Sequence, residues 1–291
     1  MTLTGEGNMH RQLLAAYWLT RAPRLPGWTF YSARQPSADP GKLRLTLGGD
    51  KFEAEALWLT PLVDAQHERI HLTVWHPLFP KLDDRARWTV TFLLLDEAFG
   101  EIGTQNWIGR IEMNDSQLNG AIPLGELRPF AERAQSEHAW KKGEPGEIWS
   151  IYSFEEEYAD RPRGDVYVVK TCATALIGDF GKAAGKLPDP LAGTGADYVY
   201  VALEAGILPN GKEADGRAEF EDALASVLEP AASGRLLGGA MGRRLAYIDL
   251  LLYDGSVSVG LVLETLRKLR LPSGTSVNYF AHEKRGHRVV L

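Results

Sequence analysis

Hydrophobic and polar positions follow clear periods along the chain, most clearly in the last hundred residues. Alternation with period two is typical of half-buried strands, and apolar residues three and four positions apart are typical of helices. Strands are predicted over 197–204, 234–241, 245–253 and 276–281. Helices are predicted over 217–228 and 256–269. The glycine-punctuated second strand is the weakest of these predictions, and the resulting order is β-α-β-β-α-β.

The same patterns, in shorter runs, predict a mixture of strands and helices upstream. Strands are predicted over 28–34, 42–47, 56–63, 70–75, 102–113, 148–154 and 165–171. Helices are predicted over 9–20, 84–98, 124–140 and 173–184. A turn is predicted over 48–50, and Gly100 is well placed to end the second of these helices.

The polar segment KKGEPG at 141–146 carries the best linker signal in the chain, because it combines charge, proline and two glycines. We therefore expect an N-terminal α+β domain over 1–143 and a C-terminal α+β domain over 147–291. Helices that cover one face of an antiparallel sheet would suit both, so the predicted class is α+β with two domains of α/β-sandwich type. The C-terminal domain is predicted to be ferredoxin-like.

Two sequence segments and the predicted order of the C-terminal elements resemble known families. The N-terminal half, with WTFYSARQP at 28–36 and LLLDEAFGE at 93–101, resembles bacterial families of unknown function. The C-terminal half resembles the ferredoxin-like fold of the ribonuclease E inhibitor B family. That fold supports many unrelated activities, so the resemblance implies an architecture and assigns no functional residue.

Composition and charge exclude several classes of function. The 291-residue chain has 44% hydrophobic residues and a net charge of −6, so it is globular in composition and lacks the strong positive charge of nucleic-acid-binding proteins. A local basic patch could still form from Arg243 and Arg244, or from Lys284, Arg285 and Arg288.

Cysteine usage and the distribution of apolar runs indicate a compartment. A single cysteine, Cys172, cannot form an internal disulfide. No signal-peptide pattern and no run long enough to span a bilayer is visible. We expect a cytoplasmic protein without a membrane partner.

Three motifs suggest cofactors or metals and fail on spacing. GDFGKAAGK at 178–186 has phenylalanine where a phosphate loop needs its first glycine. The histidines of HEKRGH at 282–287 are five residues apart, so they cannot share one helix face as zinc ligands. His71 and His76 fall on opposite faces of a predicted strand. We expect no cofactor and no metal.

A small set of polar residues remains as a candidate binding site. Asp96, Glu97 and Glu101 lie at a predicted helix C-terminus, where carboxylates oppose the helix dipole. Paired carboxylates can act as acid and base. His76 and Arg243 complete the set, the latter following the glycine-rich GRLLGGAMG at 234–242, which is either an anion-binding loop or a bulged strand.

Two functional hypotheses stay open, and the sequence does not decide whether the protein is an enzyme. The first is a protein-binding or regulatory module, because aromatic residues are common in interfaces and no catalytic constellation assembles. Its candidate contact residues are Trp28, Tyr31, Trp107, Trp149 and Tyr152. The alternative is a small-molecule or anion-binding enzyme with a site between the two domains. Substrate, partner and oligomeric state stay open.

Overall fold

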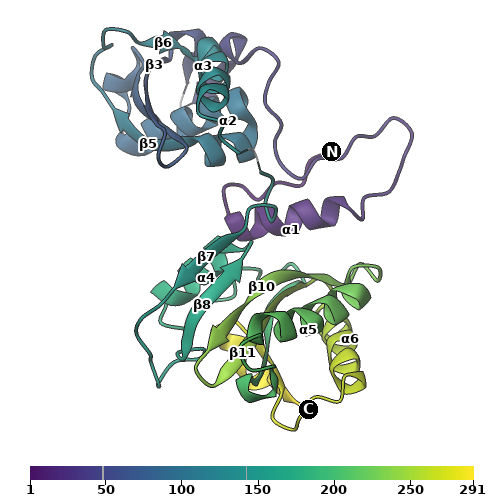
Figure 1. The fold of residues 1–291 in the computed structure, drawn as a ribbon. Helices are drawn as coiled ribbons and strands as arrows, with labels where there is room; N and C mark the ends of the chain where they lie inside the picture. Colours follow the sequence, from purple (N-terminus) through teal and green to yellow (C-terminus); the bar gives the residue numbers. More distant parts are fainter. Residues whose placement is uncertain (48, 142) are drawn as a thin grey trace. The chain divides into compact units, whose positions relative to one another are not determined.

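A computed structural model describes residues 1–47, 49–141 and 143–291 as a mixed α+β protein with largely antiparallel sheets (Figure 1). The chain divides into two compact units. The N-terminal unit contains Met1–Asn8 and Trp18–Glu144, and the C-terminal unit contains Met9–Tyr17 and Pro145–Leu291. None of the helices in the described ranges has the length and apolar character needed to cross a membrane.

Most of helix α1 (Met9–Leu19) belongs to the C-terminal unit, although the predicted N-terminal domain included it. Its aromatic side chains explain the difference. The ring of His10 lies 5.6 Å from that of Tyr198, and the ring of Tyr17 lies 6.1 Å from that of Tyr253. This helix therefore buries its apolar face in a unit whose other residues come more than a hundred positions later.

The N-terminal unit is built around a four-stranded sheet in the order β5-β4-β3-β6 and a separate hairpin of β1 and β2. The strands are β1 (Arg44–Leu47), β2 (Asp50–Glu53), β3 (Trp58–Asp64), β4 (Arg69–Trp75), β5 (Ile108–Met113) and β6 (Ile122–Pro123). The helices are α2 (Asp84–Trp107) and α3 (Leu124–Glu137). Leu94 and Leu95 of α2 and Leu127 of α3 pack into the same core as Leu59 and Val74 of the sheet.

Two strand predictions in this unit are wrong. Residues 28–34 form no strand, apart from an isolated bridge between Thr2 and Tyr31, because Trp28 stacks on Phe30 at the surface and no neighbouring strand pairs with them. Residues 102–107 are helical, since a second helical segment of α2 follows the kink at Gly100. The predicted turn at 48–50 and the predicted linker at 141–146 include Gly48 and Lys142, which lie outside the described residues.

The C-terminal unit contains a seven-stranded sheet in the order β13-β12-β9-β11-β10-β8-β7, in which every neighbouring pair is antiparallel. The strands are β7 (Ser150–Ser153), β8 (Val166–Thr171), β9 (Asp197–Glu204), β10 (Gly234–Gly242), β11 (Leu245–Leu252), β12 (Ser276–Tyr279) and β13 (Val289–Val290). The helices are α4 (Thr174–Lys182), α5 (Glu213–Leu228) and α6 (Gly255–Lys268).

The two faces of this sheet carry different side chains. Val199 and Val201 of β9 point into a core shared with Leu224 of α5 and Val262 of α6. Tyr198 and Tyr200 alternate with them, so they lie on the opposite face. That second face carries the cavities described below.

The glycine-rich segment 234–242 is a central strand, flanked by β11 and β8. Its register shifts between Leu236 and Gly238, where the chain forms a bulge. Gly238 has φ of 132°, and a Cβ there would lie 2.0 Å from the carbonyl oxygen of Lys170. Glycine is therefore needed at this close approach of two strands, which explains a composition unusual for a strand.

Gly100 ends the first of the two helical segments that make up α2, as predicted, and a kink there separates it from the second segment. The φ of Gly100 is 72°, in the left-handed region, and a Cβ would lie 2.8 Å from the carbonyl oxygen of Arg34. The next residue, Glu101, donates its N–H to that same oxygen at 3.0 Å. A side chain at position 100 would thus strain the backbone and separate α2 from the segment around Arg34.

We expect Gly100→Ala to destabilise the N-terminal unit by more than about 1 kcal/mol, because alanine adds a clash to an unfavourable φ. Urea unfolding followed by tryptophan fluorescence measures this, since Trp88, Trp107 and Trp140 lie in that unit. Gly125→Ala is the matched control, because Gly125 is helical and a Cβ there would touch nothing closer than 3.9 Å. Equal stability of the two variants would contradict the expectation.

Candidate functional site

Two of the sequence-predicted carboxylates lie near Arg34 in the N-terminal unit. The guanidinium of Arg34 lies 2.7 Å from Asp96. Burial raises the pKa of Asp96, and the charge of Arg34 opposes that rise. Glu101 is buried and accepts hydrogen bonds from the Thr4 hydroxyl at 2.5 Å and the Gly7 N–H at 3.1 Å. Glu101 therefore fixes the N-terminal segment onto α2.

His76 lies in the hydrophobic core, with its ring between those of Phe52 and Phe79 at 5.4 and 5.8 Å. Its Nδ1 accepts the N–H of Leu78 at 3.1 Å. Burial lowers the pKa of His76, which keeps the ring neutral. These contacts describe a histidine that shapes the core, and none of them involves the predicted carboxylates.

The remaining two candidates are also engaged in local contacts. Glu97 accepts the N–H of Ser37 through its backbone carbonyl at 2.8 Å. Arg243, in the C-terminal unit, lies 3.4 Å from Glu157. Within the described ranges no cluster of three or more His, Cys, Asp or Glu side chains could hold a metal ion. Four of the predicted residues lie in the N-terminal unit, where His76 contacts none of the three carboxylates, and Arg243 lies in the C-terminal unit.

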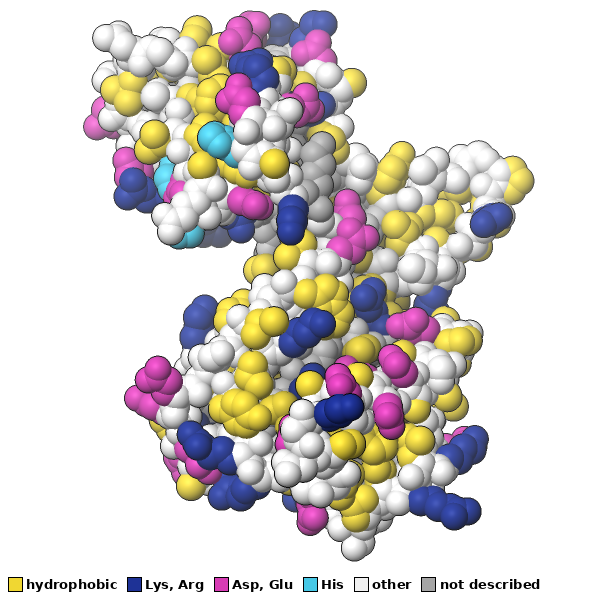
Figure 2. Space-filling model, viewed as in Figure 1, with side chains coloured by type: hydrophobic (Ala, Val, Ile, Leu, Met, Phe, Trp, Pro, Cys, Tyr) yellow, Lys and Arg dark blue, Asp and Glu magenta, His cyan; other side chains and the backbone are white. Residues whose placement is uncertain are grey.

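Exposed hydrophobic side chains gather at strand β7, the last strand at one edge of the seven-stranded sheet. Figure 2 shows hydrophobic side chains at the surface of the C-terminal unit in this region. We call this the β7 surface, and it consists of Ile148, Trp149, Ile151, Tyr152, Phe154 and Tyr167. Ile151 is 69% exposed, and because strand side chains alternate, it and Tyr152 occupy opposite faces. This edge strand is therefore apolar on both faces.

The aromatic residues predicted as contact residues divide between surface and core. Trp149 and Tyr152 belong to the β7 surface, and Trp28 and Tyr31 are exposed in the N-terminal unit. Trp107 is buried and stacks on Trp140 at 6.0 Å.

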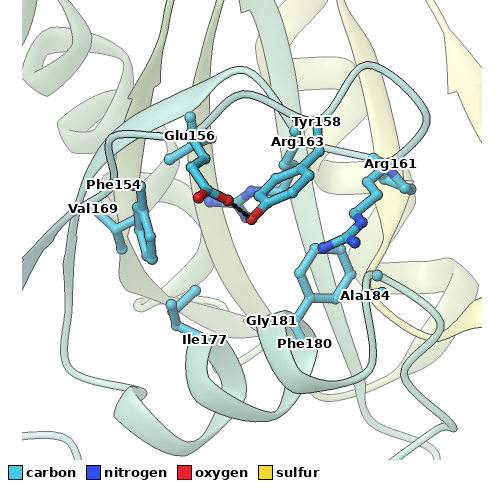
Figure 3. A pocket seen from close by; sticks show the side chains of 14 residues that line it. Phe154, Glu156, Tyr158, Arg161, Arg163, Val169, Ile177, Phe180, Gly181 and Ala184 are labelled. Atoms are coloured by element: carbon cyan, nitrogen blue, oxygen red, sulfur yellow. Dashed lines mark hydrogen bonds between the residues drawn. The ribbon is translucent and has the colours of Figure 1, made fainter.

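A pocket of about 280 Å³, the first pocket, adjoins the end of β7. Figure 3 shows its lining, which comes from the loop that begins just after β7, from β8, and from α4 and the residues that follow it. Phe154, Ile177 and Phe180 supply apolar surface. On the loop, Tyr158 donates a hydrogen bond to Glu156, and the guanidinium of Arg161 lies 4.0 Å from the centre of the Tyr158 ring. The first pocket thus combines an apolar interior with a polar rim.

The loop behind this pocket is held by its own backbone. The N–H of Tyr158 donates to the carbonyl of Gly164 at 2.8 Å, and the N–H of Gly164 donates to that of Arg161 at 3.1 Å. A Cβ at Gly164 would lie 1.7 Å from the Tyr158 carbonyl oxygen, so only glycine fits. Arg163 has φ of 60°, a conformation that residues other than glycine seldom adopt and that the surrounding structure must hold in place.

The side chain of Arg163 forms a buried ion pair with Asp249. Its two terminal nitrogens lie 2.5 and 3.1 Å from the two carboxylate oxygens of Asp249 in β11. Both side chains are almost fully buried. The guanidinium lies 4.9 Å from the ring centres of Tyr247 and Phe280 and 5.1 Å from that of Tyr200. The bidentate geometry and the rings compensate for removing both charges from water.

Asp165 supports the same loop from its other end. It accepts the hydroxyl of Tyr247 at 2.5 Å and the N–H groups of Arg244 and Leu245 at 3.0 and 3.1 Å. Burial acts to raise the pKa of Asp165, but these hydrogen bonds outweigh it and hold the pKa below its ordinary value. Burial, together with the hydrogen bond to Asp165, raises the pKa of Tyr247.

Sequence reasoning did not predict Arg163, Asp249 or Asp165. A charged residue within the apolar run LAYIDLLLY at 245–253 is the one available signal, because an unpaired charge is not tolerated in a central strand. That signal requires a buried cation elsewhere, but it does not identify Arg163 among the basic residues of the chain.

We expect Asp249→Leu to destabilise the C-terminal unit by about 3–5 kcal/mol, because it leaves the Arg163 charge buried and unpaired. The double variant Arg163→Met with Asp249→Leu should recover most of that loss, since it removes both charges. Hydrogen exchange of the β9 and β11 amides in the full chain measures the difference. A double variant no more stable than the single one would show that the pair is not the cause.

Asp165 should contribute a pH-dependent part of the stability. A carboxyl group whose pKa is lowered by folding stabilises the folded state above its unfolded pKa of about 3.9 and loses that effect as the pH falls. The stability difference between the wild type and Asp165→Asn should therefore be full at pH 7 and shrink below about pH 4. Urea unfolding at both pH values measures it. Asp222→Asn, on the exposed side of α5, is the control and should show no such change.

We compared the chain with known proteins and found none that is similar to it. No protein-family model matches the chain, and neither a curated protein nor a solved structure matches it.

Proposed function

We propose that this protein is a protein-binding, regulatory module whose C-terminal unit binds an extended segment of a partner protein along strand β7. The observation that carries the proposal is the edge strand itself. β7 pairs on one side with β8, and it ends the sheet among the described residues. Its side chains Ile151 and Tyr152 are exposed.

An exposed apolar edge strand favours aggregation unless something covers it. Edge strands in natural proteins are usually protected by charge, proline or bulges, and β7 has none of these within Ser150–Ser153. A partner strand added to this edge would gain main-chain hydrogen bonds and bury the β7 surface. Phe154 belongs to the β7 surface and also lines the first pocket. That pocket would accept one apolar side chain of the partner.

We also infer a ferredoxin-like arrangement for the core of the C-terminal unit. The elements β9, α5, β10, β11, α6 and β12 occur in the β-α-β-β-α-β order, and the strands lie in the order β12-β9-β11-β10. Strands β7, β8 and β13 extend this core. This order of elements is the one found in ferredoxin-like folds, which occur in many unrelated families. We also propose a cytoplasmic location, because a single cysteine cannot form an internal disulfide.

A photo-crosslinking residue at position 151 should capture one protein in cells of the source organism. The same residue at Val257, which is 66% exposed on α6 of the same unit, should capture little or nothing. With the captured partner, Ile151→Lys should weaken binding by about tenfold or more, as expected for a central apolar contact.

The matched control for that measurement is Val257→Lys, which adds the same charge to the same unit and should bind the partner as the wild type does. Equal crosslinking at both positions, or unchanged affinity of Ile151→Lys, would refute binding at β7.

A further inference from the structure

A second cavity of about 370 Å³ opens on the face of the sheet opposite α5 and α6. Its lining includes Tyr200 of β9, Tyr247 of β11 and Asn278 of β12, all from the C-terminal unit. Arg285 and Arg288 line it from the turn of helix at His282–His287 and the residue after it. The volume lies within the range of small-molecule sites.

The charge of this second cavity is positive. Arg163 lines it too, but Asp249 neutralises that guanidinium. Arg285 donates a hydrogen bond to the carbonyl of Gly185, which leaves its charge uncompensated. Arg288 is exposed, and although its backbone N–H donates to the carbonyl of Arg285 at 3.2 Å, its guanidinium forms no ion pair or hydrogen bond with the described residues. The described residues that line the cavity include no aspartate or glutamate.

Tyr200 adds a polar group to the lining of this cavity. The residue is 7% exposed, and its hydroxyl is not fully enclosed by protein, so a ligand in the cavity can reach it. Burial raises the pKa of Tyr200, so the group stays a neutral donor. A tyrosine hydroxyl placed in this way can donate a hydrogen bond to an oxygen atom of a ligand.

The segment that carries the two arginines is fixed in place. Lys284 lies 2.5 Å from Asp197 and 2.7 Å from Asp189. Burial acts to lower the pKa of Lys284, and its hydrogen bonds to the two carboxylates raise it above its ordinary value. Lys284 is thus committed to the structure, while Arg285 and Arg288 are left to act on a ligand.

We propose that the second cavity binds a small phosphate monoester. Two uncompensated guanidinium groups match a dianion, and a phosphate monoester carries a charge near −2 at neutral pH. Its three terminal oxygens accept hydrogen bonds from both guanidinium groups and from the Tyr200 hydroxyl. A monocarboxylate has one charge and two oxygens, so it would leave donors unpaired.

Titration calorimetry of the full chain with glycerol 3-phosphate tests this proposal. We expect saturable binding with a dissociation constant of about 1 mM or tighter, weaker binding of inorganic phosphate, and weaker binding still of the dicarboxylate succinate. Arg288→Gln should weaken glycerol 3-phosphate binding by about tenfold, because it removes a charge-assisted hydrogen bond. Tyr200→Phe should weaken it severalfold while keeping the ring.

Arg267→Gln is the control, because Arg267 is an exposed arginine on α6, which packs on the other face of the sheet. It should bind as the wild type does. No saturable binding of the phosphate monoester, equal losses in Arg267→Gln and Arg288→Gln, or tighter binding of succinate would each overturn the proposal. Binding to β7 is measured with a different ligand and different variants, so either proposal can fail alone.

Discussion

The buried ion pair between Arg163 and Asp249 determines the shape of the sheet face that carries both cavities. Asp249 lies on central strand β11, and Arg163 lies in the loop that follows β7. If the loop moved away from the sheet, the two charges would separate. One of them would then be exposed to solvent or stay buried without its partner, which is unfavourable. The pair therefore explains how a loop with a left-handed arginine and a crowded glycine keeps one conformation.

This pair also decides which charges act on a ligand. Arg163 is satisfied by Asp249 and by three aromatic rings, so it contributes structure and little net charge. Lys284 is satisfied by Asp189 and Asp197 in the same way. Of the four cations near the second cavity, the two that remain are Arg285 and Arg288, and the net charge of the whole chain gives no hint of them.

The sequence predicted the elements of the C-terminal unit well, because their periodicities are long and mark one buried face. The helix predicted over 256–269 is observed at Gly255–Lys268, and the strand predicted over 197–204 is observed at those residues. Local pattern failed where tertiary context decides. Aromatic residues at 28–34 favour a strand, but only Tyr31 pairs, in an isolated bridge with Thr2. After the kink at Gly100 the chain resumes a helix where a strand was predicted.

The candidate site was harder to predict for a related reason. Exposure of Trp149 and Tyr152 agrees with their proposed role in contacts, yet sequence alone could not separate them from buried Trp107. Asp96 and Glu101 attracted attention as carboxylates at a helix end, and they lie on either side of the kink at Gly100. Glu101, however, accepts hydrogen bonds from the N-terminal segment. Pairing across 86 positions, as between Arg163 and Asp249, leaves no local pattern to detect.

The first pocket and the second cavity share Arg163, which raises the question of whether ligands at the two places affect one another. Coupling requires an element with two arrangements that both ligands bias. The Arg163 side chain is 5% exposed and bonded through both terminal nitrogens, so a second arrangement would have to break a buried ion pair. Arg163 therefore keeps one arrangement, and a phosphate in the second cavity should leave partner binding at β7 unchanged.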